Sequence, residues 1–238
     1  MVKRVWQDEH VETELDGVHV LMRRGKRDEQ QDAVSVGPGV VAVADGMGGH
    51  ADGAAASKVA LDAFAASIHE GGRLTDAATH ADAAVRALAG DGWSPSAPGT
   101  TLVAARLDGE VVHGVWSGDS RAYRLRHDGL LEPLTVDHTA FLGGIEHALG
   151  AFSPDPLHLD RFSCDVADTA GLLLCTDGLT GPFETAWYEG GTVGDVELVD
   201  DDPTATIAML LTDRGLRGLV ELAAQVGSDN VTAVWWAL

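Results

Sequence analysis

Short apolar runs separated by turn residues are the feature that most restricts how this chain can fold. The runs "DAVSVG" and "VVAVAD" flank Pro38-Gly39, which predicts a β-hairpin near residues 32 to 45. Asp108-Gly109 and Asp128-Gly129 each separate two further apolar runs, and Asp-Gly in this setting favours a tight hairpin. Strands joined by such short turns pair antiparallel, so we expect antiparallel sheets.

Two helical blocks interrupt the strands. Between about residues 50 and 89 the chain is alanine-rich, and apolar side chains recur at helical spacing at Ala56, Val59, Ala60, Ala63 and Phe64. A second helix fits "LTDAATHADAAVRALAG", which follows Gly71-Gly72. Later strand-like runs lead to a helix near "LRGLVELAAQVG" and a final strand, "NVTAVWWAL". This order predicts one α+β domain over residues 1–238, with the irregular, acidic stretch 184–203 as a surface excursion.

The charge balance excludes some partners. The chain has 37 acidic and 16 basic residues, a formal net charge of −21. An acidic surface repels phosphate backbones and anionic lipids, so we expect no nucleic-acid binding and no membrane docking. Cys164 and Cys175 lie among apolar residues and are expected to be buried free thiols. No run has the length of a signal peptide or of a membrane span, which predicts a cytoplasmic protein.

Four aspartates stand at the margins of apolar runs. Asp45, Asp119 and Asp177 each follow such a run, and Asp229 precedes the final one. One interpretation is four separate turns, since aspartate favours turns. The other is convergence on one site, where the mutual repulsion of the carboxylates would require a cation. Ligands that are all oxygen select Mg²⁺, Mn²⁺ or Ca²⁺, and no histidine or cysteine pair at zinc spacing accompanies them. Spacing alone leaves both interpretations open.

A basic segment is a second indication of a functional site. "RRGKRDEQQD" contains Arg23, Arg24, Lys26 and Arg27 in a chain otherwise poor in positive charge. It is either a solvated turn or an anion clamp, because a guanidinium fork matches phosphate oxygens. An arginine beside oxygen-ligated metal ions is typical of phosphoryl transfer or phosphate hydrolysis.

These motifs together resemble those of the metal-dependent protein phosphatases, the type 2C serine/threonine phosphatases, in their compact bacterial form. The resemblance extends from about Leu21 to the C-terminus. The matching segments follow the order of the family: "GKRDEQQD", "VVAVADGMGGHADG", "GTTLVAARL", "WSGDSRAYRLR", "LTVDHT", "HALG", "LLLCTDGLTG" and "GSDNVTAVWW".

The resemblance implies both a fold and a site. The fold would be two stacked antiparallel β-sheets flanked by α-helices, a four-layer αββα sandwich. Two Mn²⁺ or Mg²⁺ ions would be held by Asp45, the carbonyl of Gly46, Asp177 and Asp229, and a weaker third ion by Asp119. The same correspondence implies that Arg27 binds the substrate phosphate and that Asp32 holds water bound to the metals.

The activity implied is hydrolysis of phosphoserine and phosphothreonine on proteins, in opposition to protein kinases. Two ions about 3.5–4 Å apart lower the pKa of a water between them, and the resulting hydroxide attacks phosphorus in line with the leaving oxygen. Phosphoprotein substrates, a cognate kinase pathway and a monomeric chain are expected. Residues 184–203 correspond to a variable flap, whose Asp200, Asp201 and Asp202 suggest selection of basic sequences near the phosphosite.

The chain departs from the family pattern in the basic segment and after Asp45. Gln30-Gln31 precede Asp32, where the family usually has asparagine and then glutamate or glutamine. Met47 stands where many eukaryotic members have a histidine proposed as general acid, and methionine cannot donate a proton. Water on a metal ion is the first candidate for that proton and His50 a distant second, whereas His138 is interpreted as a structural residue.

Three other functions fit the sequence less well. A non-enzymatic regulator on the same scaffold is disfavoured because all the implied metal ligands are present. A calcium-binding sandwich leaves Arg27 and "DGMGG" unexplained. A haloacid-dehalogenase-type phosphatase would need an Asp-x-Asp pair at a strand end, which "LLLCTDG" lacks.

Overall fold

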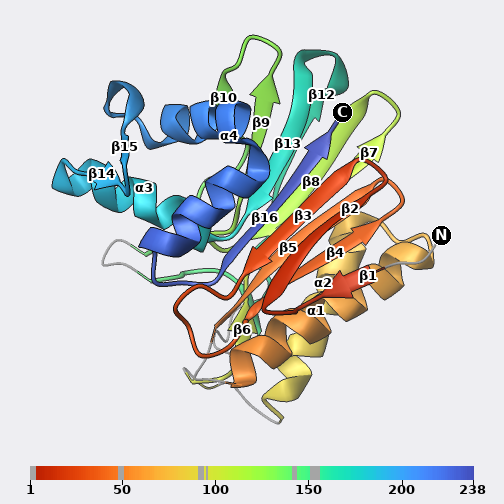
Figure 1. Cartoon of the computed structure of the whole chain (residues 1–238). Helices are drawn as coiled ribbons and strands as arrows, with labels where there is room; N and C mark the ends of the chain where they lie inside the picture. The colour runs from red at the N-terminus through yellow and green to blue at the C-terminus, as the bar shows by residue number, and fades with distance from the viewer. Residues whose placement is uncertain (1–3, 48–50, 91–93, 95, 141–143, 151–155) are drawn as a thin grey trace.

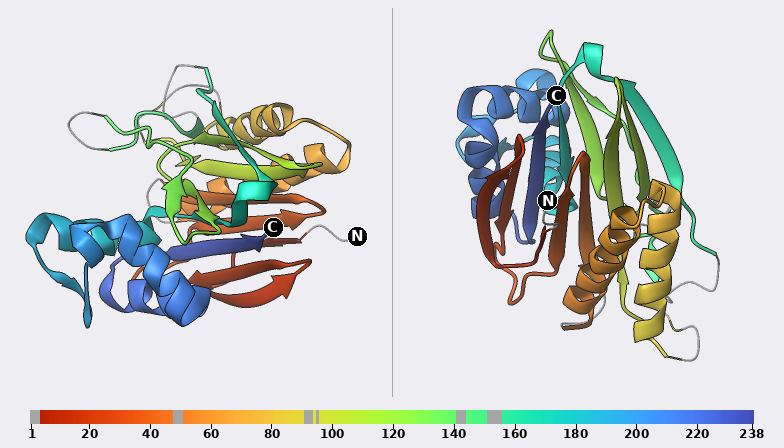
Figure 2. Two further views of the ribbon diagram at one scale, coloured as in Figure 1. Left: turned by 90° about the horizontal axis from the view of Figure 1, so that it is seen from above. Right: turned by 90° about the vertical axis from the view of Figure 1, so that its right-hand side faces the viewer.

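The computed structural model describes residues 4–47, 51–90, 94, 96–140, 144–150 and 156–238. These residues form two large antiparallel sheets, one packed on the other (Figures 1 and 2). The first, 8-stranded sheet has the path β1-β4-β5-β7-β8-β12, and off this path β6 pairs with β5 and β11 pairs with β6. Its strands are β1 Arg4–Trp6, β4 Asp32–Gly37, β5 Val40–Met47, β6 Gly99–Thr100, β7 Leu102–Asp108, β8 Val111–Ser117, β11 Leu149–Gly150 and β12 Asp160–Asp165.

The second, 6-stranded sheet has the order β10-β9-β13-β16-β3-β2. Its strands are β2 His10–Leu15, β3 Val18–Arg23, β9 Arg121–Arg126, β10 Leu131–Pro133, β13 Thr169–Cys175 and β16 Val231–Ala237. A small hairpin of β14 Thr192–Val193 and β15 Val196–Glu197 lies apart from both sheets.

Helices cover the outer face of each sheet, as Figure 2 shows. Helices α1 (Ala51–His69) and α2 (Leu74–Leu88) pack on the first sheet, and α3 (Asp177–Glu189) and α4 (Pro203–Val226) on the second. Three apolar clusters fill the spaces between the four layers. The cluster under α1 and α2 is rich in alanine, which lets the helix backbones approach the sheet closely. The expected αββα sandwich is therefore confirmed.

The sequence predictions were accurate for the strands and helices with clear periodicity. The 32–45 hairpin is β4–β5, the alanine-rich block is α1 and α2, and both cysteines are buried and free. No described helix is long and apolar enough to cross a membrane.

The structure shows which elements the stretch 184–203 contains. Its first residues complete α3, residues 192–197 form the β14–β15 hairpin, and a 3₁₀ turn, Val199–Asp201, leads into α4. Helix α4 also begins thirteen positions earlier than "LRGLVELAAQVG" suggested, at Pro203 after the N-cap Asp202. Gly215, with φ 66°, interrupts it, so helical periodicity indicated only the second half.

In helix α1, Asp52 lies in the first turn.

Candidate functional site

Asp45 and Asp32 lie side by side on neighbouring strands. The register of the β4–β5 hairpin places them directly opposite one another. Asp32 is 0% exposed, and its Oδ2 accepts a hydrogen bond of 3.1 Å from the hydroxyl of Thr176. The backbone of Asp45 is held at both ends, because its N–H donates to Thr101 Oγ1 and its carbonyl accepts from Thr101 N–H, each at 2.9 Å.

Gly46 follows Asp45 in a place with no room for a side chain. A Cβ there would lie 2.0 Å from the carbonyl oxygen of Gly53 and 2.7 Å from that of Gln31. The start of α1 therefore approaches the end of β5 through bare backbone. Met47 ends β5, whereas Gly48, Gly49 and His50 lie outside the described residues, so the expectations placed on them are untested.

Asp177 and Asp229 reach the same end of the sandwich from the second sheet. Asp177 is the first residue of α3, directly after β13, and Asp229 precedes β16, the neighbour of β13. The two segments touch at Gly178, where a Cβ would lie 1.8 Å from the carbonyl oxygen of Asn230. The Asn230 side chain joins this end to the basic segment, since its Nδ2 donates to the carbonyls of Arg24 and Glu29.

Arg27 lies at the rim of this group. Its Nη2 donates to Asp229 Oδ2 at 2.6 Å, and its side chain is 54% exposed. Arg23 is instead buried and paired with Glu221, so only part of the basic segment is available to an anion. The hydrogen bond to Asp229 raises the pKa of Arg27 and keeps the guanidinium charged.

Asp119 occupies the turn between β8 and β9. Burial raises its pKa to about 7, with the charges of Asp177 and Asp137 as further causes. It is therefore close enough to Asp177 to sense its charge, although it lies on a different turn of the fold.

The electrostatics show that the aspartates interact as one group. Burial, followed by the charges of Asp32, Asp177, Asp229 and Asp119, raises the pKa of Asp45 well above its ordinary value. Burial, with the charge of Asp177 as a further cause, raises the pKa of Asp32 to about 7. A protein that holds so many carboxyl groups in a dry region stabilises them by protonation or by a cation.

Two orphaned oxygens show that the residues fit a hard cation. Asp32 Oδ1 and Asp177 Oδ1 are buried and have no hydrogen-bond partner among the described residues. Buried carboxylate oxygens without donors are ligands that Mg²⁺ and Mn²⁺ accept.

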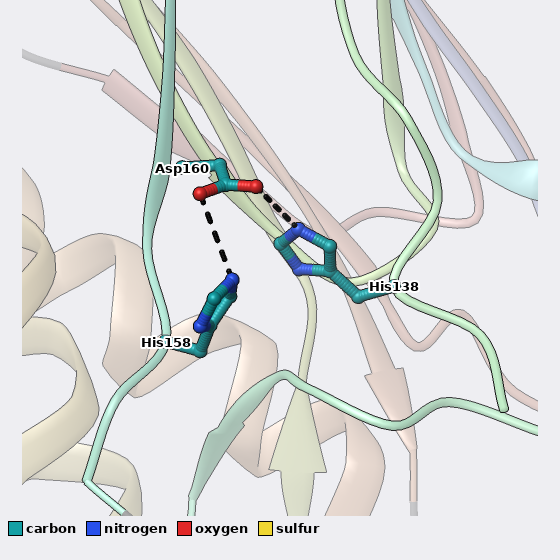
Figure 3. Close-up of side chains that lie close together, drawn as sticks. All are labelled: His138, His158 and Asp160. Carbon is teal, nitrogen blue, oxygen red and sulfur yellow. Dashed lines mark hydrogen bonds and ion pairs between the residues drawn. The ribbon is translucent and has the colours of Figure 1, made fainter.

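The aspartates do not converge on a single point. Among the described residues, only His138, His158 and Asp160 form a group of three with ligand atoms all within 4.8 Å of one another (Figure 3). No three of the described carboxylates around Asp45 meet that limit, and none of them belongs to the histidine group.

A groove of about 470 Å³ opens beside the aspartates. Asp177 and Asp229 lie at its border, and α3, the β14–β15 hairpin and the end of α4 line the rest. Among the residues that the structure describes, Glu189 is its only other acidic lining residue. Asp200, Asp201 and Asp202, which the sequence suggested as a selector of basic substrates, do not line it.

Sequence reasoning missed the residues that hold the carboxylates. Thr101 and Thr176 lie in motifs that matched the family, "GTTLVAARL" and "LLLCTDGLTG", and Asn230 lies in "GSDNVTAVWW". Nothing in the local pattern shows that their polar atoms contact residues from other strands, so the motif match was the only available signal.

An αββα sandwich that gathers partly buried carboxyl groups at one end, with a half-exposed arginine beside them, defines a class of proteins suited to holding hard divalent cations next to an anion. The profile of the protein phosphatase 2C family matches residues 23–200. The chain belongs to the protein phosphatase 2C family, and the resemblance noted from its motifs is confirmed.

Curated relatives and solved structures agree. The chain is 31% identical over 233 residues to serine/threonine protein phosphatase PstP of Mycobacterium tuberculosis. The match covers 87% of this chain and 42% of that protein. It therefore spans less than half the length of the curated relatives it matches. The crystal structure of M. tuberculosis PstP has a TM-score of 0.70 at 29% identity and covers 100% of this chain and 99% of that one.

Two further similar structures contain bound groups. The PPM Ser-Thr phosphatase MsPP from Mycobacterium smegmatis, in complex with cacodylate, has a TM-score of 0.70 at 28% identity, covering 95% of this chain and 100% of that one. The PstP catalytic domain in complex with two manganese ions has a TM-score of 0.69 at 30% identity, covering 92% and 96% of the two chains.

Proposed function

We propose that this chain is a metal-dependent serine/threonine protein phosphatase that removes phosphate from phosphoserine and phosphothreonine of proteins. The observation that carries the proposal is the contact between Arg27 and Asp229, in which a half-exposed guanidinium binds a member of the carboxylate group. A phosphate held by that guanidinium lies beside the carboxylates, as metal-assisted hydrolysis requires. Membership of the protein phosphatase 2C family supports the same activity.

The residues suited to hold two Mn²⁺ or Mg²⁺ ions are Asp45, the Gly46 carbonyl, Asp177 and Asp229, with Asp119 for a weaker third. The two manganese ions of the PstP catalytic domain support this assignment. Bound ions supply the positive charge that makes hydroxide available near neutral pH and neutralises the phosphate. The Oδ1 atom of Asp177 is the strongest local support, because it is buried and has no hydrogen-bond partner among the described residues.

The chain's own side chains bind and orient the substrate. Arg27 donates two parallel hydrogen bonds to phosphate oxygens when a substrate replaces Asp229 as its partner. Asp32 is fixed through Oδ2 by Thr176, so its Oδ1 can accept a hydrogen bond from the attacking water and orient it. Met47 has no ionisable group, so the proton for the leaving oxygen comes from elsewhere in the site.

The biological setting proposed follows from the activity. Substrates would be phosphoproteins of a serine/threonine kinase pathway, and the chain would act as a monomer in the cytoplasm. The two buried, unpaired cysteines support a reducing compartment.

Hydrolysis of p-nitrophenyl phosphate and of a phosphothreonine peptide, with Mn²⁺ and then with EDTA, tests the proposal. We expect turnover only with Mn²⁺, and loss of at least about a hundredfold in kcat/KM for Asp45→Ala and for Asp177→Ala. Asp213→Ala, an exposed aspartate of α4, is the matched control and should retain full activity. Turnover that survives EDTA would refute the metal mechanism, and no turnover with Mn²⁺ would favour a non-enzymatic regulator.

A further inference from the structure

The turn that carries Asp119 is tightly constrained. It connects β8 to β9 through Gly118, Asp119 and Ser120. Gly118 has φ 110°, and a Cβ there would lie 2.6 Å from the side chain of Thr101. Ser120 Oγ lies 2.7 Å from Thr101 Oγ1, the same hydroxyl that accepts from Asp45 N–H. The turn is therefore packed against the strand residues that border Asp45.

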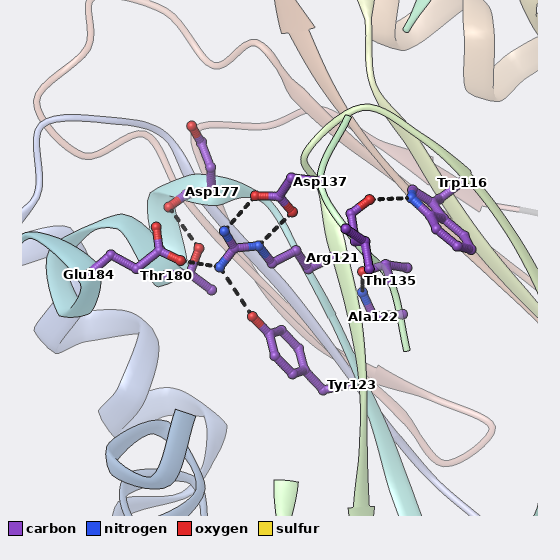
Figure 4. Close-up of polar contacts among 10 residues, drawn as sticks. Trp116, Arg121, Ala122, Tyr123, Thr135, Asp137, Asp177, Thr180 and Glu184 are labelled. Carbon is purple, nitrogen blue, oxygen red and sulfur yellow. Dashed lines mark hydrogen bonds and ion pairs between the residues drawn. The ribbon is translucent and has the colours of Figure 1, made fainter. Parts of the chain in front are cut away.

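Residues 134–136 run alongside this turn and are anchored to its two strands. Leu134 N–H donates to the Ala122 carbonyl at 2.8 Å, and Ala122 N–H donates to Thr135 Oγ1 at 3.1 Å. Trp116 Nε1 donates to the Val136 carbonyl at 2.9 Å. Figure 4 shows the contact of Trp116 with this segment and the one between Ala122 and Thr135.

Asp137 binds the residue that follows the turn, Arg121. Its carboxylate accepts two hydrogen bonds from Arg121, from Nε at 2.8 Å and from Nη2 at 2.6 Å (Figure 4). Arg121 also pairs with Glu184 of α3 and donates to the Tyr123 hydroxyl. Asp137 thus fixes an arginine that links the end of the Asp119 turn to the helix that Asp177 begins.

His138 binds the first residue of the turn, Gly118. Its backbone N–H donates to the Gly118 carbonyl at 3.1 Å, and Gly118 N–H donates to its Nδ1 at 3.2 Å. The ring stacks on Trp116, with centroids 5.7 Å apart. On its other edge, Nε2 lies 3.3 Å from Asp160 Oδ2 (Figure 3).

These contacts define the protonation of the His138 ring. Burial lowers its pKa, which favours the neutral form with a single ring proton. Because Nδ1 accepts from Gly118, that proton is on Nε2 and is donated to Asp160. A metal ion among His138, His158 and Asp160 would need the lone pair of Nε2 and would move the proton to Nδ1, facing the Gly118 N–H. The triad is therefore better explained as a support for His138 than as a metal site.

We propose that Asp137 and His138 are positioning residues that hold the Asp119 carboxylate in place for its cation, by fixing Arg121 and Gly118 on either side of it. The inference rests on the proposed function, which gives Asp119 a divalent ion to bind. Neither residue needs to touch substrate, and the role specifies the structural one that the sequence suggested for His138.

Two substitutions of His138 separate this role from simple packing. In His138→Asn the side-chain oxygen replaces Nδ1 and can accept from Gly118 N–H, although the contact with Asp160 is lost. In His138→Gln the side chain can reach Asp160 but not Gly118. Mn²⁺ binding measured by isothermal titration calorimetry and by the electron paramagnetic resonance signal of free Mn²⁺ should show weakening of the weakest site by about tenfold in His138→Gln. His138→Asn should bind Mn²⁺ within about twofold of the unmodified chain.

His158→Ala is the matched control, because His158 contacts the same Asp160 but not the turn. It should leave Mn²⁺ binding unchanged. Equal Mn²⁺ affinities for the unmodified chain and His138→Gln would overturn the inference, as would equal weakening in the Asn and Gln variants. Zn²⁺ binding that both His158→Ala and His138→Asn abolish would instead show a metal at the triad.

Activity distinguishes failure of this inference from failure of the proposed function. With p-nitrophenyl phosphate, His138→Gln should need about tenfold more Mn²⁺ for half-maximal activity and recover at high Mn²⁺. If the unmodified chain binds Mn²⁺ but has no phosphatase activity, the proposed function fails while the metal-binding test of His138 still stands.

Discussion

At the scale of single residues, Arg27 carries the clearest prediction, because it is half-exposed and its recorded partner is Asp229. Arg27→Lys retains the charge and loses the bidentate fork, so KM for the phosphothreonine peptide and Ki for inorganic phosphate should both rise about tenfold at saturating Mn²⁺. Steady-state kinetics measure both. Arg24→Ala, whose guanidinium pairs with Glu9 at the surface, should change neither. An unchanged Ki in Arg27→Lys would remove Arg27 from phosphate binding.

At the scale of elements, the contact between α3 and β16 sets where Asp177 lies relative to Asp229. Gly178→Ala would put a methyl group 1.8 Å from the Asn230 carbonyl oxygen, so the helix start must move. We expect a loss of about 1–3 kcal/mol in unfolding free energy and a large fall in kcat. Gly181→Ala, in the same helix with no atom within 4 Å of the added Cβ, should change stability by less than about 1 kcal/mol. Urea unfolding compares the two, and equal effects would show that this contact does not position the site.

At the scale of the whole molecule, the buried carboxyl groups couple stability to pH and metal. The folded-state pKa values of Asp32 and Asp119, about 7, lie above the ordinary value near 4. The metal-free folded state therefore binds more protons than the unfolded chain between about pH 4 and 7, and its stability falls as pH rises through that window. Mn²⁺ replaces the protons, so the rise in Tm that it causes should grow from pH 5.5 to pH 7.5.

Differential scanning fluorimetry with EDTA or Mn²⁺ at three pH values measures this coupling. The net charge of −21 adds a general repulsion of the same sign, so Asp119→Asn is needed to isolate the site. That variant should show a shallower fall of Tm with pH in EDTA and a smaller Mn²⁺ effect at pH 7.5. A Tm increase independent of pH would contradict the coupling.

The sequence alone determined the elements with strong local signals. Apolar runs on either side of Pro38-Gly39 predicted the β4–β5 hairpin, whereas its register, which sets Asp32 opposite Asp45, came from the structure. Alanine periodicity predicted α1 and α2. Gly215 interrupts α4, and helical periodicity predicted only its second half. Periodicity over a short window cannot show that two helical segments pack as one layer.

Only the tertiary structure decided how these pieces meet. Arg27 and Asp229 are 202 positions apart, and Thr176 and Asp32 are 144 apart, yet each pair shares a hydrogen bond. The motifs named the aspartates, but they did not show that Asp137 and His138 hold the two sides of the Asp119 turn. Local pattern records which face of a strand is buried, whereas the partner of a polar atom depends on how two sheets stack and where their turns come together. The chemistry of the site is therefore present in the sequence as residue types, and its geometry exists only in the packed fold.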